Sequence, residues 1–396
     1  MKVAIGHSED FDSKDAVDEA LDACAAMLGD LTPQAGLLYA AIDHDFQLIL
    51  DRVMARYPGL DLVGCTTGGE LSSSGGFAED SLALMLFHSD AVRFGIGLGE
   101  GVGADPAGAS RRAAAQAMAG LDAPVRLCIA TPEGLGVEMT SILAALSEAL
   151  GADVPVCGGL AADQLRFEQT FQFFRGSVHT DAIPVMLFAG PLSVATGIAS
   201  GWQPIGKEHR VTQAEGNVVY TIDGEPPSRL WAHYFGDQAI HTITPHLGIA
   251  VYPERETGVD NPETGDEAGP FFMSAPARFR EDGSMEVLNQ IPSGAALRFA
   301  DALRDDIIDG AAASIAQACR AYAGTRPDAA LAFSCAARHL NLGTRVTEEA
   351  GLLRERLGDA LPWIGFYTNG EFCPLPGSPR AQAHGGTFVT VLLGEG

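Results

Sequence analysis

The chain repeats one pattern three times, and this repetition constrains the fold more than any other feature. The copies begin at Gly36, Val125 and Ala329. Each opens with a short apolar run, which is typical of a strand buried on both faces. A polar loop, a helical spacing of apolar residues and a second apolar strand follow. A glycine-containing loop that bears an acidic residue, and then a further apolar strand, complete each copy. The repeated unit is therefore predicted to be strand, helix, strand, loop, strand.

This order of elements predicts an α/β fold with mixed β-sheets and packed helices. The last strand of each unit is expected to be a hairpin partner, which makes the sheets mixed rather than purely parallel. The first two copies lie about 90 residues apart, which is too long for a solenoid and fits duplicated subdomains. We expect two domains, residues 1–220 with two copies and residues 221–396 with the third. We place the boundary near Gly216 to Asp223, in a stretch with a turn at Asp223-Gly224, and the acidic stretch 255–269 is expected to be an exposed loop.

The charge balance excludes several classes of partner. Lys and Arg total 25 against 51 Asp and Glu, a formal net charge of -26, so nucleic acid and anionic membrane surfaces are not expected to bind.

Residues 182–206 carry no charge, but Pro184 and Gly190 interrupt them. They predict two buried strands around a turn rather than a membrane-spanning helix. The N-terminal segment also lacks the apolar core of a signal peptide.

The cysteines indicate a reducing compartment. The chain has seven, an odd number, and no two stand at C-x-x-C spacing. A disulfide framework or a structural zinc site is therefore not expected. Most of the cysteines lie in apolar runs, where a reduced thiol behaves as a small core residue. We therefore expect a cytoplasmic protein.

The glycine loops are the candidate ligand site. Strand ends in α/β folds are where ligands usually bind, and glycine lets the backbone approach them closely. The first and third copies keep Thr, Gly and Glu in step, and Arg338 ends a strand with a planar cation suited to a carboxylate. The candidate ligand-binding residues are Cys65, Thr66, Thr67, Glu70, Gly158, Gly159, Asp163, Arg338, Tyr367, Thr368 and Glu371. The alternative is structural: the glycines only permit tight turns, and Arg338 pairs with Glu70, Glu371 or another acid.

Motifs for catalysis and for metal binding are weak. The sequence has no P-loop, no G-x-S-x-G and no H-E-x-x-H. Acid–base chemistry by Glu70, Asp163 and Glu371 remains an alternative, and no catalytic residue is assigned. His233, His241 and His246 are interpreted as surface or core residues. An axial haem ligand is a further alternative, with His44, His179, His339 and His384 as candidates.

Five motifs in order resemble the FIST family. They are VGCTTGGE from Val63, CGGLAAD from Cys157, GWQPIGKEHRVTQAEGNVVYTIDGEPP from Gly201, FSCAARHLNLG from Phe333 and GFYTNGEF from Gly365. The resemblance covers residues 36–372. It implies a FIST N-terminal domain followed by a FIST C-terminal domain. It also implies a sensory module for small ligands, with amino acids proposed, in signal transduction. A subset of the family is described as haem-binding nitric-oxide sensors that act with histidine kinases or cyclic-di-nucleotide circuits.

The resemblance sets the expected function and partners. The family's motifs fall on the glycines and acids named above, and also on Gly64, Gly69, Pro204, Gly206, Asp223, Cys335, Gly365 and Gly370. We expect a sensor rather than an enzyme, with an amino-acid-like ligand whose carboxylate lies on Arg338 and whose ammonium lies near Glu70 or Glu371. Since no kinase or cyclase is fused in this sequence, the partner is expected to be a separate signalling protein. No cofactor is assigned, and haem b is the cofactor that the alternative of a nitric-oxide sensor requires.

Overall fold

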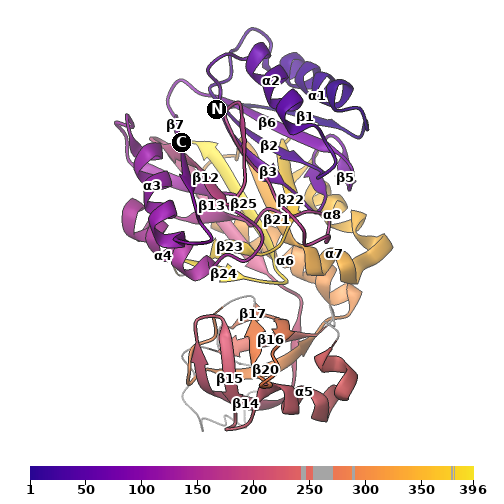
Figure 1. Ribbon diagram of the computed structural model, residues 1–396. Helices are drawn as coiled ribbons and strands as arrows, with labels where there is room; N and C mark the ends of the chain where they lie inside the picture. Colours follow the sequence, from indigo (N-terminus) through magenta and orange to yellow (C-terminus); the bar gives the residue numbers. More distant parts are fainter. Residues whose placement is uncertain (242–246, 253–270, 288–289, 376–377, 379) are drawn as a thin grey trace.

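The computed structural model consists of an α/β body and a smaller β domain, which lies below the body in Figure 1. It describes residues 1–396 except 242–246, 253–270, 288–289, 376–377 and 379. The body is built from three units of the same plan, and the β domain is inserted into the third. The predicted fold class of mixed sheets with packed helices is confirmed.

The first unit shows the common plan. Its elements are β1 (Lys2–Ser8), α1 (Ser13–Leu28), β2 (Ala35–Ala40), α2 (Phe46–Arg56), β3 (Asp61–Thr66), β4 (Glu70–Ser72), β5 (Gly76–Ala78) and β6 (Leu82–His88). The side chain of Asp12 accepts hydrogen bonds from the first amides of α1, and Asp45 does the same for α2. Each unit begins with a strand and a helix that precede the repeat found in the sequence.

The second and third units follow the same order. The second comprises β7 (Arg93–Glu100), α3 (Pro106–Met118), β8 (Val125–Ala130), α4 (Met139–Leu150), β9 (Val156–Gly159), β10 (Gln172–Phe174), β11 (Ser177–His179) and β12 (Ala182–Ala189). The third comprises β13 (Leu192–Ala199), α6 (Arg304–Ala321), β21 (Ala329–Cys335), α7 (Ala336–Leu342), η2 (Gly343–Arg345), α8 (Thr347–Leu357), β22 (Trp363–Thr368), β23 (Glu371–Pro374), β24 (Ala381–His384) and β25 (Phe388–Glu395). Strands β12 and β13 are the two buried strands expected within residues 182–206. Within the described ranges, no helix has the length and apolarity needed to cross a bilayer.

The units exchange hairpins in a cycle. The strand orders of the three sheets are β1-β6-β2-β3-β10-β11, β24-β23-β9-β8-β12-β7 and β13-β25-β21-β22-β4-β5. Thus the second unit gives its hairpin to the first, the third gives its hairpin to the second, and the first gives its hairpin to the third. Pairing registers place Gln172 opposite Cys65, Glu371 opposite Gly159 and Glu70 opposite Phe366. This exchange joins the ends of strands that lie far apart in the sequence.

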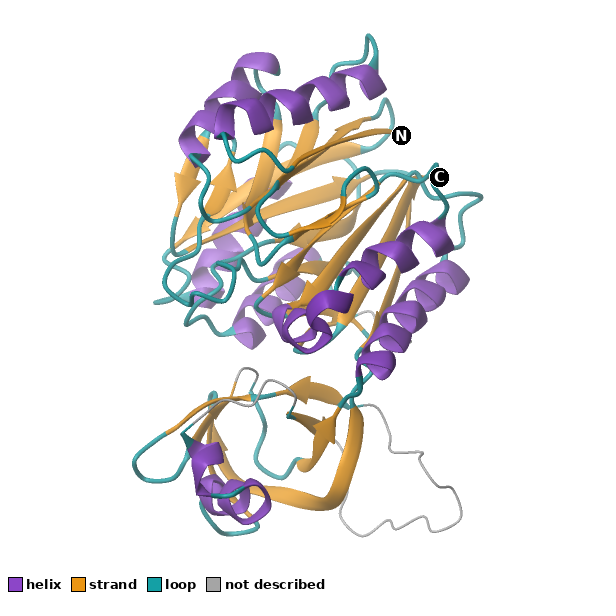
Figure 2. Ribbon diagram, turned by 90° about the vertical axis from the view of Figure 1, so that its right-hand side faces the viewer, coloured by secondary structure: helices purple, strands orange, loops and turns teal. Residues whose placement is uncertain are grey.

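One shared core fills the space between the inner faces of the three sheets. It contains residues of every unit, among them Tyr39, Phe188 and Phe366, all fully buried. The helices cover the outer faces, as Figure 2 shows. A glycine at the same place in each parallel strand pair, Gly64, Gly158 and Gly365, lies so close to the carbonyl of the neighbouring strand that a Cβ would clash with it.

The insert is an antiparallel β domain with its own core. It comprises β14 (Gln203–Glu215), β15 (Val218–Ile222), α5 (Pro227–Phe235), η1 (Asp237–Ile240), β16 (Gly248–Tyr252), β17 (Phe272–Ser274), β18 (Pro276–Phe279), β19 (Met285–Val287) and β20 (Ala296–Asp301). Trp231 packs in this separate core. The expected boundary between residues 220 and 221 lies inside β15, and the stretch 255–269 lies outside the described residues. The chain crosses from the body to the insert at residues 200–202 and returns at residues 302–303.

Candidate functional site

The three glycine loops of the repeats meet and interlock. The amide of Gly68 donates to the carbonyl of Tyr367 (2.8 Å), and the amide of Leu160 donates to the carbonyl of Gly370 (2.9 Å). The amide of Ala162 donates to the carbonyl of Thr66 (2.9 Å), which closes the ring. The hairpin exchange therefore brings the predicted loops together, as the sequence pattern required.

In the first loop, Glu70 is sealed inside the protein. Its carboxyl accepts hydrogen bonds from the hydroxyls of Thr67 and Ser81, the latter at 2.5 Å, and the residue is fully buried. Burial raises the pKa of Glu70 to about 8, while the hydroxyl donors lower it in part. At neutral pH the group is therefore mostly protonated. It cannot offer an exposed negative charge to a ligand.

The third loop repeats this arrangement. The carboxyl of Glu371 accepts from the hydroxyl of Thr368 (3.2 Å) and from the hydroxyl and amide of Thr387 (2.7 and 3.1 Å). Burial raises the pKa of Glu371 to about 7. The thiol of Cys335 lies beside this carboxyl, and burial raises the pKa of the thiol. The first and third loops therefore share one arrangement, a Thr-x-x-Glu turn whose carboxyl also accepts a hydrogen bond from a hydroxyl just before the last strand of the unit.

The second loop departs from the other two. Asp163 does not occupy the equivalent position, because its carboxylate accepts from the amides of Phe167, Glu168 and Gln169 and closes a turn. Gln172, the first residue of β10, stands where Glu70 and Glu371 begin β4 and β23. The carboxyl of this loop is Glu133, which accepts from the hydroxyl of Thr170. Sequence reasoning missed Glu133, although it stands only three residues after Ala130, the last residue of β8.

Arg338 has protein partners for its guanidinium. Its Nε and Nη2 donate to Oε1 of Glu349 at 2.9 and 2.7 Å, and both side chains are fully buried. Nη2 also donates to the carbonyl of Ile307 (2.7 Å), and Nη1 donates to that of Ser200. Glu349 in turn accepts from Tyr367. The assignment of a ligand carboxylate to Arg338 is therefore corrected: the residue ties together the two points where the chain enters and leaves the insert.

The other residues that were predicted to bind a ligand make contacts within the protein or allow close packing of its backbone. The hydroxyl of Thr66 accepts from the amide of Phe171 (3.1 Å), and the thiol of Cys65 is buried, which raises its pKa. Gly158 has a φ of 141°, and a Cβ on Gly159 would clash with Thr368. The loops converge as predicted, but they pack against one another instead of opening as a cleft.

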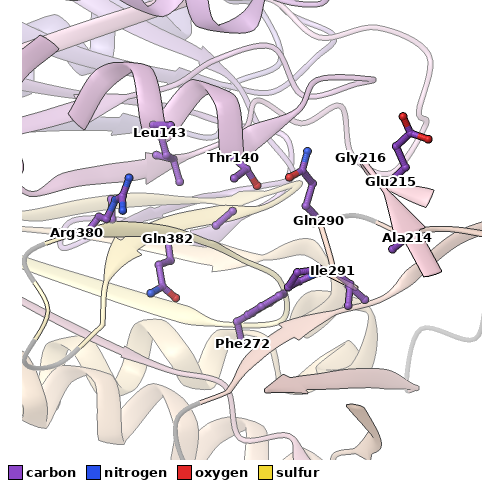
Figure 3. A pocket seen from close by; sticks show the side chains of 14 residues that line it. Thr140, Leu143, Ala214, Glu215, Gly216, Phe272, Gln290, Ile291, Arg380 and Gln382 are labelled. Carbon is purple, nitrogen blue, oxygen red and sulfur yellow. The ribbon is translucent and has the colours of Figure 1, made fainter. Parts of the chain in front are cut away.

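Two cavities lie where the insert meets the body. The larger, here called the interdomain cavity, has a volume of about 480 Å³. Figure 3 shows its lining. The body supplies α4 and β24, and the insert supplies the β14–β15 turn, β17 and the segment before β20; the lining residues are Thr140, Leu143, Ala144, Ala214, Glu215, Gly216, Phe272, Gln290, Ile291, Pro292, Arg380, Ala381, Gln382 and Ala383. Leu143, Phe272 and Ile291 make the surface largely apolar.

Arg380 is the cation of this cavity. Its side chain is exposed, and no acidic residue in the described part of the chain forms an ion pair with it. Glu215 lies at the opposite end of the lining in Figure 3. The interdomain cavity therefore offers both charges at its rim and amides from Gln290 and Gln382. No motif in the sequence predicted this cavity, because its lining residues come from five separate segments.

The smaller cavity, here called the hinge cavity, has a volume of about 340 Å³ and lies where the chain crosses to the insert. Its lining consists of residues 198–204, 271–273, Leu375, His384 and Thr387. Thr387 also holds Glu371, so this cavity is adjacent to the third loop.

Most candidate haem ligands have partners at the surface. His44 contacts Ser13, His179 contacts Glu100 and His339 contacts Glu79. His384 lines the hinge cavity, whereas His246 lies outside the described residues. Within the described part of the chain, no cluster of three or more His, Cys, Asp or Glu side chains could hold a metal ion.

His209 was missed by sequence reasoning. Its Nδ1 lies 2.7 Å from Asp223, and its Nε2 is buried with no hydrogen bond to the described residues. The ring contacts Tyr234 and Phe299 in the insert. The signal for it was weak, because its partner stands fourteen residues away across a hairpin.

Comparisons with known proteins place the chain among its relatives. The FIST N domain model matches residues 34–225 and the FIST C domain model matches residues 230–374. The uncharacterized protein Rv0628c of Mycobacterium tuberculosis is 26% identical over 99% of this chain and 100% of its own length. MJ1623 of Methanocaldococcus jannaschii, also uncharacterized, is 38% identical over 73 residues, which are 18% of this chain and only 14% of that protein. A crystal structure of cyanuric acid hydrolase from A. caulinodans is 14% identical, covers 50% of this chain and 71% of its own, and has a TM-score of 0.27, which supports no argument about function.

Proposed function

Since the chain belongs to the FIST family, whose domains are generally small-ligand sensory domains in signalling, we propose that it senses an amino-acid-like molecule in the interdomain cavity. The observation that carries this proposal is a cavity of about 480 Å³ with walls from two domains and, at its rim, a guanidinium that forms no ion pair with any described residue. The volume lies within the range usual for small-molecule sites. The proposed ligand site is therefore the junction between body and insert, and not the repeated loops that the sequence pattern favoured.

The lining matches the chemistry of an amino acid. Arg380 presents a planar fork that binds a carboxylate in a bidentate manner. The side-chain carbonyls of Gln290 and Gln382 accept hydrogen bonds from an ammonium group, whereas Glu215 lies at the opposite end of the lining from Arg380. Leu143 and Phe272 offer apolar contact to a side chain. An amino acid with an apolar side chain is the ligand that uses all three properties.

The position of the cavity suggests how binding is transmitted. A ligand that contacts α4 and β24 of the body and β17 of the insert favours the arrangement in which these walls are close. Binding therefore shifts the population of insert orientations. A separate signalling protein, such as a histidine kinase or a cyclic-di-nucleotide enzyme, would recognise the favoured arrangement.

A binding role is also favoured over catalysis by the acidic loops. Glu70 and Glu371 are fully buried and already bonded to hydroxyls, so neither is placed to exchange a proton with a substrate. Six of the seven cysteines are buried free thiols, which agrees with residence in the cytoplasm. The proposed partners accordingly exclude nucleic acid and membrane surfaces, in line with the charge of -26.

Isothermal titration calorimetry with the twenty common amino acids tests the proposal. We expect at least one apolar amino acid to bind with a stoichiometry of one, and its amide, which lacks the carboxylate, to bind much more weakly. Arg380→Ala should weaken binding by about tenfold, the value of one charge-assisted hydrogen bond. Arg126→Ala, which removes an exposed arginine in β8, is the matched control and should bind normally. Unchanged affinity in Arg380→Ala would remove the interdomain cavity from consideration.

A haem-binding nitric-oxide sensor is the second candidate, and His209 favours it. Haem bound through a histidine would supply an iron that binds nitric oxide. His209 fits the donor required, because Asp223 fixes its Nδ1 and its buried Nε2 has no hydrogen bond to any described residue. Carboxylates orient metal-bound histidines in the same way. Neither cavity described above includes His209 in its lining. Added haem b should give a Soret band that His209→Ala loses and that His233→Ala, an exposed neighbour, retains; a colourless mixture excludes this candidate.

A further inference from the structure

The hinge cavity has properties that differ from those of the interdomain cavity. Ile198, Trp202, Phe271, Phe272 and Leu375 make most of its wall apolar. None of the described residues that line it is an acid, a lysine or an arginine. A charged ligand would therefore lose its hydration without gaining a counter-charge, and the lining selects against ions.

Four polar side chains line this cavity, those of Ser200, Gln203, His384 and Thr387. The hydrogen bonds of Thr387 and His384 fix what these two can offer. The hydroxyl of Thr387 donates to Glu371 at 2.7 Å, so its proton is engaged and its free lone pair is an acceptor. The Nε2 of His384 lies 3.1 Å from the carbonyl oxygen of Cys373. A carbonyl only accepts, so Nε2 carries the proton, and Nδ1 of the neutral ring is an acceptor.

Burial supports the neutral form of this ring. It lowers the pKa of His384 to about 4, so the imidazole is uncharged at pH 7. In the described part of the chain, Nδ1 has no hydrogen-bond partner. His384 is only 1% exposed, and the hinge cavity is the space that it lines.

We propose that the hinge cavity is a second ligand site, which takes small neutral molecules with an apolar, preferably aromatic, body and an O–H or N–H donor, as in phenols and indoles. The donor of such a molecule binds the acceptors of His384 and Thr387, and its ring packs on Trp202 and Phe272. This inference does not depend on the amino acid proposed for the interdomain cavity. It rests on the acceptor character of the polar groups and on the apolar wall.

Hydrogen bonds connect the hinge cavity to the segments where the chain enters and leaves the insert. Ser200, which lines the hinge cavity, gives its carbonyl to Arg338, and Arg338 also holds Ile307 just after the chain returns from the insert. A ligand here contacts both the crossing segment and β17 of the insert. Occupancy should therefore stiffen the junction and stabilise the protein against unfolding.

Phenol and anisole form the test pair, because they share a ring and differ in the O–H donor. Titration calorimetry on the full chain should show phenol binding with a stoichiometry of one and about 3- to 10-fold tighter than anisole, the effect of one net hydrogen bond. His384→Leu should abolish this difference between the two compounds. Equal affinities of phenol and anisole for the wild type, or no binding of phenol at millimolar concentration, would overturn the inference.

Two variants locate the binding. Ala199→Leu and Leu375→Phe add volume to the lining from independent segments, and each should reduce phenol affinity by at least tenfold. Leu375 is only partly buried, so its variant keeps the test valid where Ala199→Leu fails to fold. Ala123→Leu, the same enlargement at a half-buried alanine before β8, is the control. Arg380→Ala should leave phenol binding unchanged. If Arg380→Ala lost phenol binding while Ala199→Leu and Leu375→Phe kept it, phenol would not bind in the hinge cavity.

Discussion

Removal of the guanidinium of Arg338 should destabilise the protein rather than abolish ligand binding. In Arg338→Met, the aliphatic part of the side chain is preserved while Glu349 loses its counter-charge. Glu349 then remains fully buried with only the hydroxyls of Ser334 and Tyr367 as donors. The carbonyls of Ser200 and Ile307 lose a donor at the same time.

The expected loss follows from this set of contacts. Breaking a buried ion pair by removing one partner typically costs about 3–5 kcal/mol, because the other charge is left uncompensated. Since Arg338 also serves two backbone carbonyls, we place Arg338→Met in the upper part of that range. Arg320→Ala, at an exposed arginine on α6, should change stability by less than about 0.5 kcal/mol.

Urea unfolding followed by circular dichroism measures the effect. Arg338→Met should shift the transition to lower urea, and the double variant with Glu349→Leu should lose less than the sum of the two single variants, by about 0.5–3 kcal/mol. The amino acid that stabilises the wild type should still stabilise folded Arg338→Met. A loss below about 1 kcal/mol together with lost ligand binding would refute the structural role and favour a direct ligand contact.

Three further predictions concern the loops, the repeated glycines and the thiols. Burial raises the pKa of Glu70 to about 8 and of Glu371 to about 7, both above the ordinary 4.5, so the native state holds these protons more tightly than the unfolded state. The free energy of unfolding should therefore fall as the pH rises from 5 to 8, by at most about 4 kcal/mol for Glu70 and about 3 kcal/mol for Glu371. Glu70→Gln and Glu371→Gln should flatten the dependence of melting temperature on pH, and an unchanged slope would contradict this. Gly365→Ala should destabilise the protein by more than about 1 kcal/mol, because the added Cβ would clash with the carbonyl of Ala332. Gly351→Ala has open space on α8 and should stabilise the protein by about 0.5–1 kcal/mol in thermal melts. Equal effects of the two variants would refute the close packing of Gly365 against the neighbouring strand. Native protein should expose one fast-reacting thiol, Cys319, to a thiol reagent, and Cys319→Ser should remove that reaction, while rapid labelling of several thiols would contradict the burial of the others.

The repeat in the sequence predicted the body of the fold because its signals are local. Apolar runs, helical spacing and glycine at strand ends depend on neighbours in the chain, and they predicted β2, α2 and β3 and their equivalents. The family assignment, with a FIST N domain followed by a FIST C domain, was also confirmed. The meeting of the Thr-Gly-Glu loops followed from the repetition itself.

The predictions that were wrong concern contacts between segments that lie far apart in the sequence. The cyclic exchange of hairpins places Gln172, not Asp163, at the position of Glu70 and Glu371, and no spacing in the sequence reports this. Arg338 was expected to meet a ligand, but Glu349 on α8 neutralises it in the fold. The interdomain cavity brings Arg380 of the body to Phe272 of the insert, a pairing that exists only after the insert has folded onto the body.

The location of a bound amino acid tests the central claim most directly. A crystal structure of the full chain, grown with the amino acid that gives the strongest heat in calorimetry, would show it. We predict density for the ligand in the interdomain cavity, with its carboxylate on the guanidinium of Arg380. Density beside Glu70 or Glu371, in a cleft opened between the interlocked loops, with the interdomain cavity empty, would contradict the account.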